Sequence, residues 1–318
     1  MNRSVITIAV GTTYYLKLAE NLLKSFLLWN TGNEIHFLLV TDNTKFFDKY
    51  NDNSKVSIQQ IDLIETDKSF TSKFKLFELA IAADNLFIDC DCLIYKDISY
   101  IFEAFKGCSF SAIGNDIVDG EFFCDVKKTL KYFNLNAMPK FVGSVYYFKN
   151  DLKAERIFKA AEELKNSYDE LGFIRLRDKE NEEPLFAVAL GIAGEALLPN
   201  NGTVKADLMY YKKIVCNVLS GKAMVSRPIL EIAGGEMIPD KAFPAILHFN
   251  GSFSEGYDYK SESFRLRYNT YNIYLLNALS FINFKVSYTI KRGIKNCFRM
   301  AYRFIWGYRK IEKSNRVS

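Results

Sequence analysis

Short apolar runs alternate with segments of helical periodicity in the first part of the chain. The runs are rich in β-branched residues and end in polar or glycine turns, as buried strands do. They predict strands at residues 5–10, 35–40, 56–61 and 86–88, and the segments between them predict helices at 16–29 and 71–83. Such alternation is typical of an α/β fold with a Rossmann-like, mainly parallel sheet and helices on both faces.

The regular alternation stops after residue 97. Isolated strands are predicted at residues 110–113, 144–148 and 245–249, and helices at 151–171 and 185–190. The sequence has no internal repeat and no low-complexity linker. We therefore expect one mixed α/β domain over residues 1–263, followed by a helical tail over residues 264–318.

Composition and charge separate these two parts of the chain. With 318 residues, 49% apolar residues, 27 Phe and 19 Tyr, the chain is globular and too apolar to be disordered. Its net charge is +5, but the tail carries +11 and residues 1–263 carry −6. An acidic body with a basic tail indicates that the tail has an electrostatic partner of its own.

The cysteines and the N-terminus favour a cytoplasmic protein. The six cysteines are scattered and match neither a disulfide framework nor a zinc pattern, so we expect reduced thiols. An apolar alternating run begins almost at the first residue, without the charged region and cleavage site of a secretory signal.

The strongest chemical signal is a pair of aspartates, Asp89 and Asp91, directly after the predicted strand at residues 86–88. Carboxylates two positions apart in an extended segment point the same way, and open α/β sheets bind ligands at the carboxyl ends of their strands. Two such carboxylates repel each other, and a hard divalent cation relieves that repulsion. The pair therefore predicts a Mn²⁺ or Mg²⁺ site, with turn or cap residues as the structural alternative.

The sequence around this motif resembles the donor site of the family 8 glycosyltransferases, which have the GT-A fold and include bacterial lipopolysaccharide galactosyl- and glucosyltransferases and glycogenin. The resemblance rests on residues 71–76, 83–85 and 86–94 and extends loosely over residues 5–251. It implies a metal-dependent hexosyltransferase that uses a nucleotide-sugar donor, UDP-linked, and a glycan or lipid-linked glycan acceptor in bacterial cell-surface polysaccharide synthesis. Within the predicted domain, it implies a donor half at about 1–110 and an acceptor half at about 111–263.

On the donor side, the resemblance assigns roles to residues at two strand ends. Lys73 holds the place of a basic residue that contacts the donor, although the family usually has arginine there, and a solvated lysine is the alternative. Tyr14 would stack on the nucleotide base, or else only cap a helix. The implied donor-binding residues are Ala9, Val10, Tyr14, Lys73, Asp89 and Cys90.

The remaining residues of the implied site lie on a late strand and at the start of a helix. His248 resembles the family's third metal ligand beside Asp89 and Asp91, and a core histidine is the alternative. Glu183 and Glu182 fall where members of the family have residues that face the sugar. They are therefore the catalytic candidates, with Glu183 ranked first. A carboxylate there accepts the acceptor's proton or stabilises an oxocarbenium-like transition state; otherwise the two glutamates only complement a helix dipole. The family's Lys-Pro-Trp segment after the histidine is absent.

The basic tail predicts contact with a membrane surface. Apolar residues recur at helical spacing over residues 290–305, and lysine and arginine recur at steps of four on a neighbouring face. A basic amphipathic helix of this kind, with aromatic residues near its end, suits an anionic membrane surface, and we expect residues 290–310 to hold the protein on the inner face of the cell membrane. The alternative is a helix packed on the body; no motif supports nucleic-acid binding.

Two other functions share some of these features. A phosphatase of the haloacid-dehalogenase type also has two aspartates after an apolar strand and would use Asp89 as its nucleophile. Its motif normally ends the first strand, however, and here it ends a later one. A non-catalytic, nucleotide-binding protein associated with a membrane would need the same donor pocket without turnover.

Overall fold

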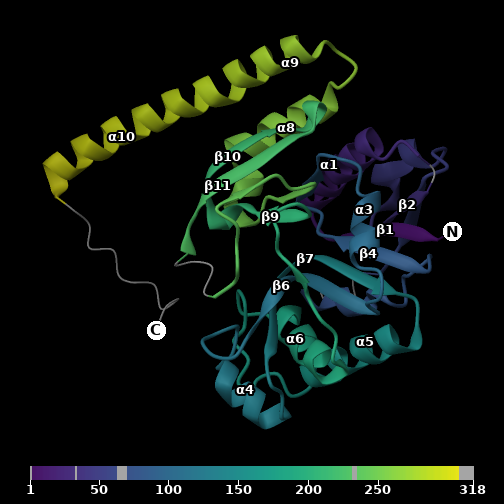
Figure 1. Ribbon diagram of the computed structural model, residues 1–318. Helices are drawn as coiled ribbons and strands as arrows, with labels where there is room; N and C mark the ends of the chain where they lie inside the picture. The colour runs from purple at the N-terminus through teal and green to yellow at the C-terminus, as the bar shows by residue number, and fades with distance from the viewer. Residues whose placement is uncertain (1, 33, 63–69, 231–234, 308–318) are drawn as a thin grey trace. The chain divides into compact units, whose positions relative to one another are not determined.

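A computed structural model describes residues 2–32, 34–62, 70–230 and 235–307 of this protein (Figure 1). The chain forms two compact units, residues 1–255 and 256–318. Helix α8 (Tyr257–Arg267) lies across the boundary that the sequence places after residue 263. Each unit is described by itself below.

Unit 1 is built on a seven-stranded sheet with the order β3-β2-β1-β4-β7-β6-β8. Its strands are β1 (Arg3–Ala9), β2 (Ile35–Thr41), β3 (Val56–Gln60), β4 (Asp84–Ile88), β6 (Phe110–Ile117), β7 (Met138–Lys149) and β8 (Leu198–Pro199). All of them run the same way except β7, which is antiparallel to both of its neighbours. The predicted α/β class and the mixed, mainly parallel sheet are therefore confirmed.

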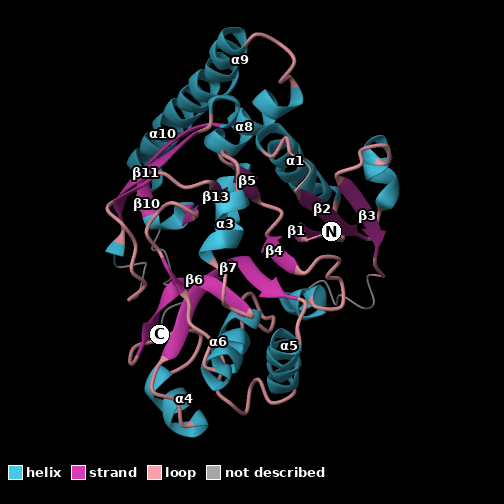
Figure 2. Ribbon diagram, turned by 45° about the vertical axis from the view of Figure 1, so that its right-hand side comes forward, coloured by secondary structure: helices cyan, strands magenta, loops and turns pink. Residues whose placement is uncertain are grey.

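Helices cover both faces of this sheet (Figures 1 and 2). On one face lie α1 (Thr13–Trp29) and α3 (Ser99–Ala104), and on the other α5 (Leu152–Lys165) and α6 (Glu182–Ala193). Neighbouring strand residues alternate between the two layers: Val5 packs with α1 and α3, whereas Ile6 packs with α5 and α6. This explains why the strands are apolar throughout rather than alternating with polar residues.

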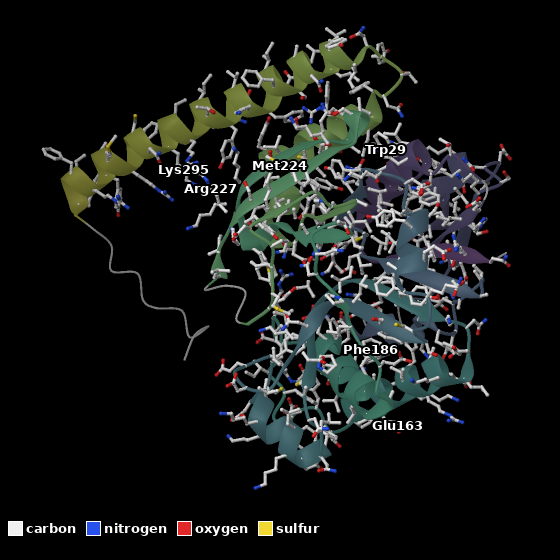
Figure 3. The ribbon with its side chains drawn as sticks, viewed as in Figure 1. Trp29, Glu163, Phe186, Met224, Arg227 and Lys295 are labelled. Atoms are coloured by element: carbon white, nitrogen blue, oxygen red, sulfur yellow. The ribbon has the colours of Figure 1, made fainter. Side chains whose placement is uncertain are left out.

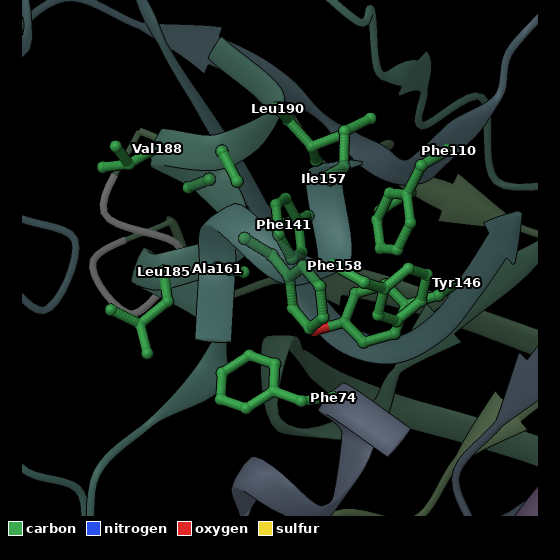
Figure 4. Packing of buried hydrophobic residues seen from close by; sticks show 14 of the residues in the cluster. Phe74, Phe110, Phe141, Tyr146, Ile157, Phe158, Ala161, Leu185, Val188 and Leu190 are labelled. Carbon is green, nitrogen blue, oxygen red and sulfur yellow. The ribbon is translucent and has the colours of Figure 1, made fainter. Parts of the chain in front are cut away.

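The layer that α5 and α6 form against the sheet is rich in contacts between aromatic rings (Figure 4). Phe110 of β6 lies 5.1 Å from both Phe158 and Phe186, and 5.5 Å from Tyr146, between ring centroids. Such pairs contribute about 0.5–1.5 kcal/mol each beyond the burial of their surface. In Figure 3, Phe186 lies inside the molecule and the polar side chain of Glu163 faces outward from α5. This rigid layer supports the strand β7 and the first turn of α6.

Two smaller sheets extend unit 1. The first has the order β5-β13-β9, from Cys92–Ile94, Ile246–His248 and Lys205–Asp207, and the second joins β10 (Tyr211–Asn217), β11 (Lys222–Pro228) and β12 (Lys241–Ala242). In the first, His248 pairs with Cys92 on one side and with Asp207 on the other. The late strand is thus brought beside the segment that follows β4.

Three predicted helices differ from the observed ones. The helix predicted at 71–83 is wrong, because a short 3-10 helix, η2 (Phe70–Leu76), stands there and ends in turns. Its residues Lys73, Phe74 and Leu76 are all buried, so a lysine that the helical pattern would place on the solvent side is inside the molecule. Helix α5 ends at Lys165, before the predicted residue 171, and α6 begins at Glu182, with Asn181 as its cap.

Shorter elements fill the remaining connections of unit 1. They are α4 (Val126–Phe133), η1 (Thr44–Tyr50), η3 (Leu208–Tyr210), η4 (Val218–Ser220) and η5 (Gly251–Glu255).

Unit 2 is helical, as the sequence predicts for the tail. It contains α8, α9 (Ile273–Ser280), a π-helical turn η6 (Phe281–Val286) and α10 (Ser287–Trp306). The hydroxyls of Ser261 and Ser280 form a buried hydrogen bond of 3.0 Å between α8 and α9. In contrast, α10 has no buried residue. Among the described residues, no helix combines the length and the apolar character needed to cross a membrane.

Candidate active site

The two aspartates of the motif lie in the turn that connects β4 to β5. The backbone N–H of Asp89 donates to Ser144 O of β7 (2.9 Å), and the N–H of Cys92 donates to Asp89 O (3.0 Å). The N–H of Phe249 donates to Asp91 O at 3.0 Å, which fixes the other side of the turn to the end of β13. The motif therefore stands at the carboxyl end of β4, where ligands bind in sheets of this kind.

His248 lies between two carboxylates. Its Nε2 is 3.2 Å from Asp91 Oδ1, and its Nδ1 is 2.7 Å from Asp207 Oδ1. Burial lowers the pKa of His248, but Asp91 and Asp207 raise it overall to about 10. The ring is therefore positively charged between the carboxylates. A histidine that donates Nδ1–H to a carboxylate is also the usual arrangement of a metal ligand, because the bond orients Nε2 toward the cation.

Asp207 is itself held by Lys205, and the sequence analysis identified neither residue. Both side chains are almost fully buried, and Lys205 Nζ donates to Asp207 Oδ2 (2.9 Å), Val142 O (3.0 Å) and Ser144 Oγ (3.2 Å). Burial would raise the pKa of Asp207, but Lys205 and His248 hold it below its ordinary value. Asp207 therefore stays ionised and orients the imidazole of His248.

Lys73 is a buried hub rather than a solvated lysine. Its Nζ donates to Glu182 Oε1 (2.7 Å), Gly143 O (2.7 Å) and Asp89 Oδ2 (3.2 Å). Burial disfavours the charged amine, but Asp89 and Glu182 outweigh this effect and raise its pKa. Burial also raises the pKa of Asp89, to about 6, although Lys73 acts against this shift. The lysine thus links the motif to the start of α6.

The two glutamates at the start of α6 differ in their surroundings. Glu182 is 1% exposed at its side chain, and its Oε2 has no hydrogen-bond partner among the described residues. Glu183 is half-buried, and its Oε1 accepts the N–H of Gly143 at 2.8 Å. Burial and the neighbouring Glu182 raise the pKa of Glu183 to about 7. Glu183 therefore combines partial exposure with a pKa near neutral.

Only glycine fits at position 143 of β7, opposite these two glutamates. A Cβ at this position would lie 2.4 Å from Tyr146 Oη and 2.8 Å from Glu182 Oε1. Both distances are shorter than any van der Waals contact, so a side chain here would displace the glutamates. The close approach also allows both peptide groups of Gly143 to bond with site residues.

The predicted base pocket lies at the exit of β1. Ala9 is buried and Val10 is partly buried. Tyr14, at the start of α1, donates its hydroxyl to Ser254 Oγ at 2.7 Å and leaves 38% of its surface exposed. Burial and the acids Glu255 and Asp91 raise the pKa of Tyr14, although its hydrogen bond to Ser254 acts against this shift.

Three side chains could hold a metal ion. Asp91, Cys92 and His248 each offer a ligand atom, and these atoms lie within 4.8 Å of one another. Burial and the nearby aspartates raise the pKa of the Cys92 thiol well above its ordinary value, which makes it a poor ligand. The same holds for the Cys90 thiol. Asp91 and His248 supply the oxygen and nitrogen ligands that suit Mn²⁺, whereas the contact of Asp89 is with Lys73.

Several solved structures are similar to this chain, while no protein-family model and no curated protein sequence matches it. The galactosyltransferase LgtC, in complex with donor and acceptor sugar analogs, has a TM-score of 0.49 and 13% identity over 78% of this chain and 87% of its own. Mouse xyloside xylosyltransferase 1 has a TM-score of 0.49 and 11% identity over 80% and 99%. The glycosyltransferase GlyE of Streptococcus pneumoniae TIGR4 has a TM-score of 0.42 and 14% identity, and the match spans 62% of this chain and 45% of GlyE.

Proposed function

We propose that this protein is a metal-dependent GT-A glycosyltransferase that moves a hexose from a UDP-linked donor to a hydroxyl of a glycan or lipid-linked glycan. The observation that supports the proposal is the contact of Asp91 with His248 at the carboxyl end of β4, next to Asp89, which Lys73 holds. A role in bacterial cell-surface polysaccharide synthesis follows only from the resemblance in sequence.

The cation that we propose here is Mn²⁺ or Mg²⁺, held by Asp89, Asp91 and His248. The site suits a cation, because the ring of His248 already carries a positive charge between two carboxylates. A bound cation would replace that positive charge once Nε2 has lost its proton. When bound, such a cation neutralises the diphosphate of the donor and stabilises the departing nucleotide. Asp207 keeps the ring oriented during this exchange.

The remaining residues would bind and orient the sugar. Glu182 Oε2 is free to accept a hydrogen bond from a sugar hydroxyl, while Oε1 keeps Lys73 in place. Glu183, which keeps part of its surface exposed, would accept the acceptor's proton or stabilise positive charge at the anomeric carbon. At the exit of β1, Ala9, Val10 and Tyr14 would take the nucleotide base.

A panel of nucleotide sugars tests the class of reaction. We expect one UDP-sugar to raise the melting temperature of the protein only when Mn²⁺ is present, because donor and cation bind together, and to release UDP when a glycoside acceptor is added. A protein that responds to no donor with Mn²⁺ or Mg²⁺ would contradict the proposal. Phosphate captured covalently on Asp89 would instead identify a phosphatase.

Unit 2 would hold the enzyme on the inner face of the membrane. Along α10, the large side chains Ile290, Ile294, Phe298 and Ile305 are each more than half exposed. The same helix carries Lys291, Arg292, Lys295, Arg299 and Arg303 and no acidic residue. Apolar side chains beside a row of cations suit the boundary of an anionic bilayer. The rest of the predicted contact, residues 308–310, lies outside the described residues.

Cosedimentation with vesicles tests this membrane contact. Because each buried apolar side chain contributes about 1.5–3 kcal/mol, Ile294→Ser with Phe298→Ser is expected to weaken binding to anionic vesicles at least roughly 10-fold. The control is Leu152→Ser on α5, a similarly exposed residue of unit 1, which should bind as the wild type does. Equal binding of wild type to neutral and anionic vesicles, or to neither, would contradict the proposal.

A further inference from the structure

The hairpin of β10 and β11 gathers positive charge that the candidate active site does not use. Residues 211–228 contain four cations and no acid, a net charge of +4 within a body of residues 1–263 that carries −6, so the rest of that body carries −10. The four cations, all of them exposed, are Lys212, Lys213, Lys222 and Arg227. Charge of one sign collected on one hairpin of an oppositely charged unit indicates a surface for an anionic partner.

The pairing of the strands places three lysines on one face of the small sheet. Lys213 of β10 and Lys241 of β12 both lie opposite Ser226 of β11, and Lys222 lies four positions before Ser226 on the same strand. Residues directly opposite each other share a face of a sheet, as do residues an even number of positions apart along one strand. Lys213, Lys222 and Lys241 therefore define one lysine face. The opposite face is buried at Ala223, Val225 and Ala242.

The centre of the lysine face is apolar. Val215 and Met224 lie opposite each other there, and both are only partly buried (Met224 is labelled in Figure 3). At the edge of the face, Phe243 is 50% exposed, and Lys241 Nζ lies 4.9 Å from the centroid of its ring. Among the described residues, no carboxylate forms an ion pair with any of the three lysines.

This combination fits the surface of an anionic bilayer. The apolar stem of a lysine can lie along apolar surface while its ammonium group stays at the level of the lipid phosphates. Partly exposed apolar and aromatic side chains between such lysines suit the boundary between head groups and acyl chains. Because the lysines have no acid of their own chain to neutralise them, lipid phosphates would supply the missing negative charge.

We infer that the lysine face of the sheet β10-β11-β12 is a second membrane contact, which binds the phosphate groups of anionic lipids. The inference rests on the proposed membrane association and adds to it a contact within unit 1, the unit that carries the candidate active site. Two contacts on one chain strengthen each other, so the loss of either weakens binding of the whole protein.

The test is cosedimentation of the full chain with vesicles of phosphatidylserine and phosphatidylcholine. Lys213→Gln with Lys222→Gln should weaken binding roughly 30-fold, which corresponds to about 2 kcal/mol, because each lysine near an anionic surface contributes about 1 kcal/mol. Both side chains are exposed, so this variant should melt at the temperature of the wild type. At high salt the difference in binding should shrink, because ions screen exposed charges.

Lys127→Gln with Lys131→Gln on α4 is the matched control. It removes the same charge from exposed positions of unit 1 and should bind vesicles as the wild type does. An equal loss of binding in both variants would show that net charge alone drives the association, and would overturn the inference. Dissociation of a wild-type dimer by the substitutions at Lys213 and Lys222, without vesicles, would assign the face to a second copy of the chain instead.

The same measurements separate this inference from the proposals on which it rests. If Ile294→Ser with Phe298→Ser weakens binding and Lys213→Gln with Lys222→Gln does not, the lysine face is refuted and the contact of α10 remains. A wild type that binds no anionic vesicle refutes both contacts. Transfer of sugar to a soluble glycoside should be unchanged in the variant of Lys213 and Lys222, so the proposed activity is tested independently.

Discussion

Asp91→Asn is expected to reduce sugar transfer by roughly 1,000-fold, the upper range for losing one group that stabilises developing charge. Asparagine keeps the size of the side chain and still contacts His248, but it removes the negative charge that a cation requires at this place. The expected readouts are loss of UDP release and loss of the Mn²⁺-dependent rise in melting temperature with the donor.

Two other variants, each with a smaller expected effect, serve as comparisons for Asp91→Asn. Asp169→Asn removes a carboxylate of an exposed ion pair with Arg175 and should leave transfer unchanged. Asp207→Asn should cost roughly 10- to 100-fold, the usual effect of losing the partner that orients a ligating histidine. Metal-dependent donor binding that survives in Asp91→Asn would refute the assignment of the cation site.

Lys73→Met is expected to destabilise unit 1 by about 3–5 kcal/mol, as removal of one partner from a buried ion pair does. The substitution preserves most of the apolar stem but leaves Asp89 and Glu182 without their shared cation. The measurement is urea unfolding followed by circular dichroism, in which the midpoint should fall without a change in slope.

The same 3-10 helix provides the control. Lys75 makes an exposed ion pair with Glu78, so Lys75→Met should cost less than about 1 kcal/mol. Adding Glu182→Gln to Lys73→Met should recover part of the lost stability, because one unpaired charge is then removed. If the two lysine variants unfold at the same urea concentration, the buried hub does not stabilise the fold.

The sheet could be predicted from the sequence because its strands are apolar on both sides. A strand such as β2, which is buried along its whole length, gives an uninterrupted apolar run that needs no tertiary information to recognise. The 3-10 helix η2 could not be predicted, because its shape follows from Lys73 turning inward to three acceptors. The hairpin of β10 and β11 was also missed, since polar and charged residues interrupt the apolar ones in its strands.

The site was predictable where its chemistry is local. Asp89 and Asp91 are only two positions apart in the sequence, and His248 ends a recognisable strand. Asp207 was missed because its role depends on the pairing of β9 with β13. The signal that could have found it is the alternation of Lys205 and Asp207 on one face of an otherwise apolar strand. Gly143 could not be found without the positions of the glutamates opposite.

The reversed direction of β7 has a consequence for how the candidate site can change. Because β7 runs antiparallel to β4 and extends past its carboxyl end, its main chain, and not a loop, contacts the residues of the candidate site. Peptide groups of Val142, Gly143 and Ser144 anchor Lys205, Lys73, Glu183 and the turn at Asp89. Except at position 143, where a side chain would displace the glutamates, an exchange of side chains along the strand leaves these main-chain anchors in place. New specificities must therefore arise on the surrounding segments, while the strand's backbone stays constant.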